Sequence, residues 1–350
     1  MKSELRVPPP REKVWFIEWL RIAACLAVVL IHSFCTIRTN STVAELGIGR
    51  ALTWTELEIV FGRWAVPVFL MITGTLLLDP ARTLGINKIS KYVSRIAMVL
   101  LVFGTGYALM ELVFSERTLN LAMLPAAFLR MLEAKSWDHM WYLYDLLGIY
   151  LLLPLLRSFV GSADRDTYRL TLLMLFIFCC IVPTVNNVFS TKVKNVLWLG
   201  SSVFYVLLGW YLSAYAKADR GLLALAAASL AAVAILAAVG IVAFGVYWAY
   251  LWSPSSPFVV IYSAALFAFA KQGLNRPMKA GGAAQALSRL SFAVYLVHPI
   301  FANLLYKALD WVAAPLPPVV FEIVTYLLIL IPSLAFSAVL VRVPGLRKLL

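Results

Sequence analysis

The stretch FIEWLRIAACLAVVLIHSF, residues 16–34, decides the class of fold. Its apolar run is long enough to cross the hydrocarbon core of a bilayer, which takes about 20 helical residues. It nevertheless carries Arg21 near its start and His32 near its end. Because ionisable side chains are costly inside a membrane, both residues are candidates for a functional site.

The rest of the chain has the same character as this stretch. It has 350 residues, of which 62% are hydrophobic and 13% charged, and its mean hydropathy is +0.87. A soluble domain is about half apolar and about a quarter charged. The apolar runs are continuous and do not alternate, which favours helices over a barrel. We therefore predict an all-α, polytopic transmembrane helix bundle of about ten spans. The predicted spans are 14–36, 57–78, 92–114, 139–160, 168–186, 196–215, 222–246, 257–272, 289–308 and 318–341.

The basic residues predict the orientation of these spans. Lys and Arg concentrate in the segments on the same side as the N-terminus, so the positive-inside rule places both termini in the cytoplasm. The net charge of +13 then reflects topology and attraction to membrane lipids, and nucleic acid is not an expected partner. We predict a cytoplasmic arm (1–13), a single transmembrane domain (14–341) and a cytoplasmic basic tail (342–350). The outer segment LAMLPAAFLRMLEA, 121–134, is expected to form a short interfacial helix.

Helical geometry relates Arg21 to His32. Eleven residues separate them, so they lie within about 20° of one helix face and about 16 Å apart along the axis. Cys25 and Val28 are expected on the face between them, and Glu18 is placed to pair with Arg21. This stripe favours an elongated ligand that is held at its inner end and reacts near His32. The alternative is that Arg21 extends to the headgroups and His32 bonds a neighbouring helix.

Other ionisable groups are predicted at a similar depth. From their positions in the spans, Arg63, Glu111 and His139 should lie near the level of His32, with His298 close to mid-depth. For Arg63, extension to the headgroups is again the alternative. The cysteine and histidine spacings are not those of a metal site, so no metal is expected. Cys25 as a nucleophile is a further alternative.

Five motifs carry a family resemblance. They are FIEWLRIAACLAVVLIHSF (16–34), RWAVPVFLMITGTLL (63–77), HMWYLYDLLGIYLLLPLL (139–156), FYVLLGWYL (204–212) and LSFAVYLVHPIF (290–301). In this order they resemble the acyltransferase-3 family of integral membrane acyltransferases. Within that family the chain most resembles the branch that O-acetylates bacterial surface polysaccharides, including enterobacterial common antigen.

This resemblance implies an activity and a set of partners. The donor would be acetyl-CoA, with no permanently bound cofactor, and the acceptor a hydroxyl of a glycan or glycolipid. The location would be the bacterial inner (cytoplasmic) membrane. His32 would occupy the essential histidine position and Arg21 that of its partner arginine. A histidine suits base catalysis because it titrates near pH 6.5.

We accordingly assign roles to the candidate residues. His32 is expected to deprotonate the acceptor hydroxyl, while Arg63 or His298 stabilises the tetrahedral intermediate. Glu18 and Arg21 are expected to bind the donor. Supporting residues are expected from the motifs and from depth: Glu111, His139, Trp141, Tyr142, Ser291, Tyr295 and His298.

Other functions remain open at this point. A secondary transporter or exporter also has charged residues at mid-depth, although the chain shows no paired halves. A structural or sensory membrane component would leave the His and Arg residues unexplained. Within the family, the acyl group could be longer or the acceptor not a glycan. An acetyl-histidine intermediate is an alternative to direct transfer.

Overall fold

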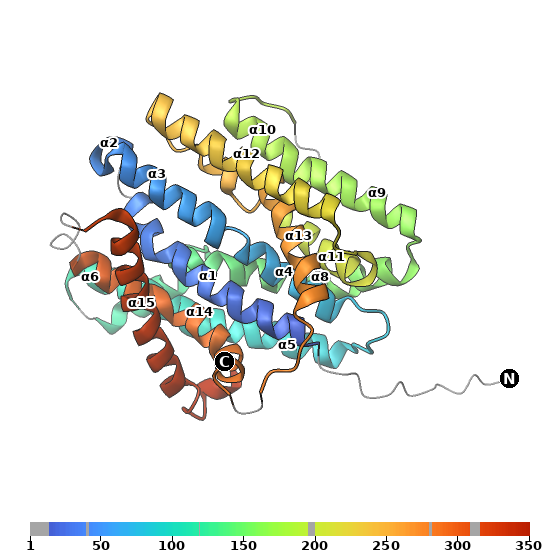
Figure 1. Cartoon of the computed structure of the whole chain (residues 1–350). Coiled ribbons are helices and arrows are strands. Elements are labelled where there is room, and N and C mark those ends of the chain that lie inside the picture. The colour runs from blue at the N-terminus through green and yellow to red at the C-terminus, as the bar shows by residue number, and fades with distance from the viewer. Residues whose placement is uncertain (1–13, 40–41, 119, 195–199, 280–281, 309–315) are drawn as a thin grey trace.

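The protein is a bundle of helices. The computed structural model describes residues 14–39, 42–118, 120–194, 200–279, 282–308 and 316–350, and no strand occurs among them. Many of the long helices run side by side along a common direction (Figure 1). Nine helical segments within these ranges are long and apolar enough to span a membrane. The prediction of an all-α polytopic bundle is confirmed.

Each of the nine candidate spans corresponds to one predicted span. Most ends differ from the predicted ones by a few residues, and the largest differences amount to about two helical turns. They are made of the following elements: α1 (Trp15–Thr39); α3, η1 and α4 (Ile48–Leu57, Glu58–Gly62, Ala65–Leu77); α5, η2 and α6 (Ile86–Val99, Leu100–Gly104, Thr105–Glu116); η4 and α8 (Asp138–Met140, Trp141–Ser162); α9, η5 and α10 (Arg165–Phe176, Ile177–Ile181, Val182–Val188); α12 (Arg220–Phe244); η6 and α13 (Ala249–Trp252, Pro257–Gly273); α14 (Ala283–Ala308); and α15 (Pro318–Leu340).

The remaining predicted span, 196–215, is represented by α11 (Ser201–Tyr215). Its first residues fall in 195–199, outside the described part of the chain, so its full length stays a prediction. The predicted interfacial segment forms η3 (Leu121–Met123) and α7 (Leu124–Leu132), and Leu121, Leu129 and Leu132 are exposed on it. The other short elements are α2 (Val43–Leu46) and η8 (Leu346–Lys348). The predicted arm, 1–13, lies outside the described residues.

Local sequence signals fix where several helices begin and end. Asp164 caps α9 by accepting hydrogen bonds from the backbone N–H groups of Asp166 and Thr167. These bonds, chiefly that from Thr167, hold the pKa of the Asp164 carboxyl below its ordinary value. Asp219 caps α12 in the same way, and α12 ends at Gly245, which adopts the left-handed conformation that glycine permits.

Helix α1 lies at the centre of the bundle. It packs against α4, α13, α14, α15 and the π-helical segment η1. Its buried residues Leu20, Ala24 and Val28 belong to the largest apolar cluster, which also contains Met71 of α4 and Phe267 of α13. Most of the length of α1 is therefore packed between other helices.

Helices α4 and α11 approach so closely that their backbones touch. A Cβ atom added at Gly74 would lie 1.8 Å from the carbonyl oxygen of Val206, and one at Gly209 would lie 2.2 Å from that of Met71. Thr75 Oγ1 also donates a 3.0 Å hydrogen bond across this contact to the carbonyl of Gly209. Small residues commonly permit such packing between membrane helices.

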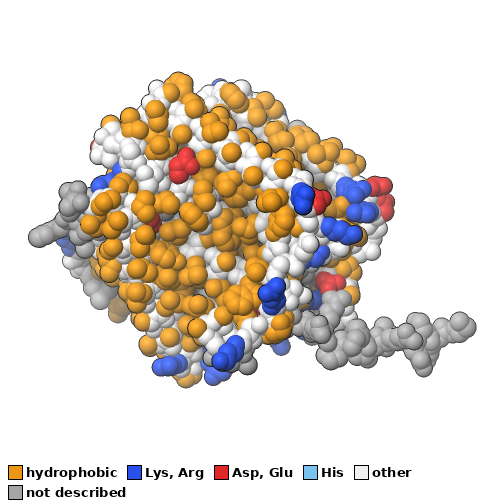
Figure 2. Space-filling model, in the orientation of Figure 1, with side chains coloured by type: hydrophobic (Ala, Val, Ile, Leu, Met, Phe, Trp, Pro, Cys, Tyr) orange, Lys and Arg blue, Asp and Glu red, His pale blue; other side chains and the backbone are white. Residues whose placement is uncertain are grey.

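The outer surface of the bundle suits contact with lipid. Figure 2 shows hydrophobic side chains over most of the visible face, with basic side chains mainly toward its edges. Helix α12 is the least buried of the candidate spans, with 17% of its most apolar window inside the bundle. A surface of this kind is expected of a multi-pass membrane protein.

Candidate active site

A cavity of about 480 Å³ lies inside the bundle. Its wall is formed by residues of α1, α4, α5, α8 and α14, together with His139 of η4 and Leu350 near the C-terminal end of the described chain. Its volume falls within the range of about 300–1,000 Å³ found for small-molecule pockets. Both Arg21 and His32 line it, with Val28 between them. The predicted stripe on α1 therefore faces this cavity.

Cys25 does not lie on that stripe as expected. Its thiol points toward α14 and donates a 3.4 Å hydrogen bond to the carbonyl of Ser291. It is buried in a separate apolar cluster with Val29 and Val294, and it is not among the described residues that line the cavity. The geometry gives no support to Cys25 as a nucleophile.

Helices α1 and α14 run in the same direction along the cavity, and successive residues of one helix face successive residues of the other. Near one end, Ser288 donates a hydrogen bond to the Glu18 carboxylate. At the other, the rings of His32 and His298 lie 4.9 Å apart between centroids. The cavity thus has two chemically different ends, separated by about three helical turns.

The first end, which we call the arginine end, is lined by Arg21, Arg95 and Arg289. The predicted ion pair is present, with Arg21 3.1 Å from the Glu18 carboxylate. Arg95 of α5 donates hydrogen bonds of 2.8 and 2.7 Å to the main-chain oxygen atoms of Leu349 and Leu350. Three guanidinium groups gathered at one end of a partly open cavity form a site for an anionic group.

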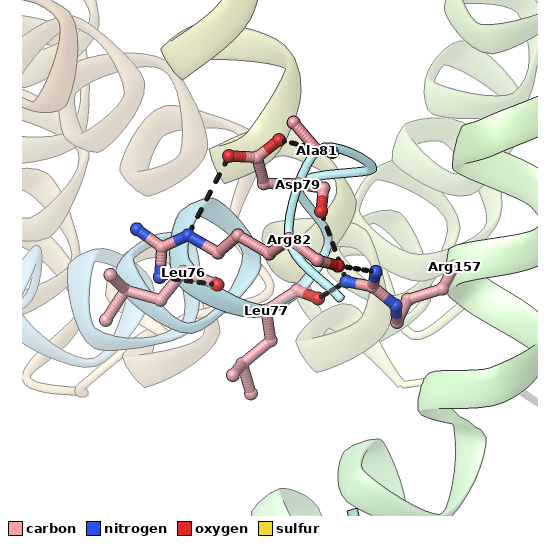
Figure 3. A network of polar contacts seen from close by, with 6 residues as sticks. All are labelled: Leu76, Leu77, Asp79, Ala81, Arg82 and Arg157. Carbon is pink, nitrogen blue, oxygen red and sulfur yellow. Dashed lines mark hydrogen bonds and ion pairs between the residues drawn. The ribbon is translucent and has the colours of Figure 1, made fainter. Parts of the chain in front are cut away.

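A partly buried arginine holds the loop beside the arginine end. Arg157 of α8 donates hydrogen bonds to the carbonyls of Leu77, Asp79 and Arg82 (Figure 3). Arg82 in turn donates a 3.0 Å bond to the carbonyl of Leu76 and lies 3.8 Å from the Asp79 carboxylate. Because Leu76 and Leu77 line the cavity, this network fixes part of its wall.

The second end, which we call the histidine end, brings together all three histidines of the chain. His32 and His139 line the cavity. His298 lies behind them, with its ring centroid 4.9 Å from that of His32 and 5.9 Å from that of His139. The sequence placed these residues at similar depth, and the structure shows that their helix faces meet.

Most of the predicted supporting residues also reach the cavity. Trp141, Tyr142, Ser291 and Tyr295 line it, and the Tyr295 hydroxyl donates a 2.5 Å hydrogen bond to the carbonyl of His139. Glu111 does not join them. It is half-exposed on α6, where its carboxylate lies 3.7 Å from Arg130.

Arg63 lies beside the cavity and does not line it. It follows η1, and its guanidinium pairs with the carboxylate of Glu58, which is fully buried. It also lies within electrostatic range of His32. Because it engages a buried acid, Arg63 does not extend to the headgroups.

Two features bring Arg63 to this position. The backbone N–H of Arg63 donates a 3.0 Å bond to the carbonyl of Glu58, five residues earlier, as in a π-helix. Gly62 allows η1 to approach α1, since a Cβ there would lie 2.5 Å from Cγ1 of Ile31. This close approach brings the segment that carries Arg63 near α1, and Arg63 lies within electrostatic range of His32.

Sequence reasoning missed several polar groups. Glu58 was overlooked because side chains five residues apart diverge in an α-helix, and only the π-helical turn joins it to Arg63. Nothing in the sequence around Arg95 and Arg289 distinguished them from the other basic residues that lie at the ends of spans. Glu322 of α15, which accepts a hydrogen bond from Ser33, did carry one: it is an acid within an apolar span.

The described residues contain no group of three or more His, Cys, Asp or Glu side chains arranged to hold a metal ion. The site is a partly open, mainly apolar passage with arginines at one end and imidazoles at the other. Arginine side chains can bind an anion, and imidazoles can accept and return a proton. The cavity therefore has the side chains of an enzyme active site within a membrane protein.

The comparison with family models identifies the class of enzyme. Residues 14–342 match the acyltransferase domain of the acyltransferase-3 family, so the chain belongs to that family. It is a multi-pass membrane acyltransferase that acts on an acyl donor and an acceptor. Comparisons with curated proteins and with solved structures gave no match.

Proposed function

We propose that the protein is an O-acetyltransferase of the bacterial inner membrane. It moves an acetyl group from acetyl-CoA to a hydroxyl of a surface polysaccharide or lipid-linked glycan. The observation that carries this proposal is the single cavity that joins the arginine end to His32. An elongated donor with an anionic head and a reactive thioester tail fits that arrangement.

The arginine end binds the phosphates of the donor. Arg21, Arg95 and Arg289 provide the positive charge, and arginine is well suited to phosphate because its planar guanidinium donates several hydrogen bonds. With the N-terminus in the cytoplasm, this end faces the compartment that supplies acetyl-CoA. Glu18 holds Arg21 in place through their ion pair.

The pantetheine arm extends from the arginines along the apolar wall. Val28, Phe69 and Ile72 line this part of the cavity. About 16 Å of helix separates Arg21 from His32, a distance that an extended pantetheine arm can bridge. The thioester carbonyl then lies at the histidine end.

His32 acts as the general base. It takes the proton of the acceptor hydroxyl as the hydroxyl oxygen forms a bond to the thioester carbon. The C–S bond of the tetrahedral intermediate then breaks, and the thiolate of CoA takes the proton back from His32. Arg63 contributes positive potential from behind the cavity wall, so we assign it a positioning role and no contact with the reacting atoms.

The family favours acyl transfer over the transport of an unmodified solute and over a structural or sensory role. Within the family, the alternatives are a donor with a longer acyl group or an acceptor other than a glycan.

The alternative mechanism is transfer in two steps through an acetyl group bound covalently to His32. Acid quenching after exposure to radiolabelled acetyl-CoA without acceptor tests that route, because only a covalent intermediate leaves label on the protein.

The decisive experiment measures transfer by the purified protein in lipid nanodiscs. Radiolabelled acetyl-CoA and a lipid-linked glycan extract are supplied, and label in the glycan is measured. We expect His32→Ala to abolish transfer without loss of folding, because transfer then has no base. A His32→Ala variant that turns over at the wild-type rate would refute the assignment.

Donor binding is tested with a matched pair of arginines. Arg21 and Arg169 each pair with an acid three residues earlier, but Arg169 lies away from the cavity. Arg21→Ala should raise the KM for acetyl-CoA about tenfold or more, whereas Arg169→Ala should leave it unchanged. Equal effects of the two substitutions would contradict the donor site.

The acceptor is tested in cells. Mass spectrometry of surface glycans from a deletion strain should show the loss of one acetyl group per modified hydroxyl. Unchanged glycans would point to another acceptor.

A further inference from the structure

His298 is a buried histidine that the proposed chemistry does not yet use. Its side chain has no exposed surface, and it is not among the described residues that line the cavity. Its ring lies close to those of His32 and His139, both of which line it. His298 therefore lies next to His32 without lining the cavity itself.

The surroundings of His298 determine which of its nitrogens carries the proton. Nδ1 lies 3.0 Å from the carbonyl oxygen of Val294, one turn earlier in α14. A carbonyl only accepts hydrogen bonds, so Nδ1 must be the donor and carry the hydrogen. In the neutral ring, Nε2 is then left with a lone pair and no hydrogen.

This lone pair is unsatisfied in the resting protein. Nε2 of His298 is buried, and it finds no hydrogen-bond partner in the described part of the chain. Leaving a buried acceptor unpaired costs about 1–3 kcal/mol, so a folded protein retains one at a stability cost. Its place beside the His32 ring, 4.9 Å away, is what makes this unpaired group a candidate for a role in the reaction.

No hydrogen bond joins His32 and His298 in the resting structure, but their rings are close enough for one to form. Two imidazoles joined by an N–H···N bond have centroids about 5 Å apart, and those of His32 and His298 are 4.9 Å apart with a steep angle of 71° between the rings. The distance from His298 to His139 is longer, at 5.9 Å. His32 is thus the better placed donor to Nε2.

We propose that His298 is the positioning residue of His32. When the acceptor hydroxyl is bound, Nε2 of His298 accepts a hydrogen bond from one ring nitrogen of His32, and this bond keeps the lone pair of the other nitrogen directed into the cavity. This inference rests on the proposed function, because it concerns the step in which His32 removes a proton from the acceptor hydroxyl.

The proton balance of the step is as follows. The hydroxyl proton moves to the cavity-facing nitrogen of His32, and the hydroxyl oxygen bonds to the thioester carbon. The positive charge on His32 is stabilised as its other N–H donates a hydrogen bond to Nε2 of His298. Nε2 can also take up the proton of that N–H, which leaves His32 neutral. When the C–S bond breaks, the thiolate receives a proton from His32, and both rings return to the neutral state.

Three substitutions separate this role from a structural one. The amide oxygen of glutamine can occupy the position of Nε2, whereas that of asparagine is too short to reach it, and leucine fills the space without an acceptor. We compare His298→Gln, His298→Asn and His298→Leu for thermal stability, for the KM for acetyl-CoA and for kcat. The two amide variants are matched in polarity, so they remain informative where the leucine variant does not fold.

We expect kcat to fall about 10²-fold in the asparagine and leucine variants, with an unchanged KM for acetyl-CoA, and to fall clearly less in the glutamine variant. The proposal is overturned if folded glutamine and asparagine variants lose kcat equally, or if folded His298→Leu turns over at the wild-type rate. A wild-type protein that transfers no acetyl group from acetyl-CoA contradicts the proposed function instead, so the two failures are distinguishable.

Discussion

The contact between α4 and α11 yields a quantitative prediction about stability. In Gly74→Ala, the new Cβ would lie 1.8 Å from the backbone oxygen of Val206. Since ordinary contacts begin near 3.4 Å, the two helices would have to separate by about 1.6 Å. No rotamer change relieves this overlap, because the opposing atom belongs to the backbone. We expect a loss of about 3 kcal/mol, at the upper end of the usual range for overpacking.

Gly148 provides the matched control. It lies within α8, and a Cβ at this position meets no atom within 4 Å. Gly148→Ala should stabilise the protein by up to about 1 kcal/mol, because alanine is the better helix former. The assay is thermal unfolding of both variants in the same detergent. Gly74→Ala should melt on the order of 5 °C below Gly148→Ala. Equal melting temperatures would refute the close approach of α4 and α11.

Three further predictions concern the cavity. Gly62→Ala should push Ile31 and shift Arg63 relative to α1, so that steady-state kinetics show kcat lowered by about tenfold, with a smaller loss of melting temperature than in Gly74→Ala because the opposing atom belongs to a side chain. Arg157→Ala should leave loop carbonyls unsatisfied and cost about 2 kcal/mol, with faster hydrogen–deuterium exchange in residues 78–85; unchanged exchange there would contradict its role. Arg95→Ala should raise the KM for acetyl-CoA about tenfold while kcat is retained, and a fall in kcat alone would argue against a donor site.

Much of the fold could be predicted because membrane spans are long, apolar and continuous. Even the predicted span 257–272, which is short and begins at a proline, appears as the helical part Pro257–Gly273. The pitch of an α-helix was enough to place Arg21 and His32 on one face of α1, and both line the cavity. These features depend on one helix at a time.

The features that could not be predicted depend on two helices. Depth along the membrane placed His32, His139 and Glu111 at a similar level, but depth does not say how each helix is rotated about its own axis. His139 turns inward and Glu111 turns outward to Arg130. The pairing of Arg63 with Glu58 required knowledge of a local departure from α-helical geometry, which a hydrophobic pattern does not reveal.

The π-helical turn at Glu58–Gly62 has a consequence for how this chain is compared with its relatives. Such a turn holds one residue more than the corresponding α-helical turn. An alignment that treats residues 48–77 as one uninterrupted α-helix therefore puts positions on the two sides of the turn out of step by one, which is about 100° of rotation. A relative without the extra residue needs a single gap inside 58–62 before its residues beside His32 can be matched to Arg63.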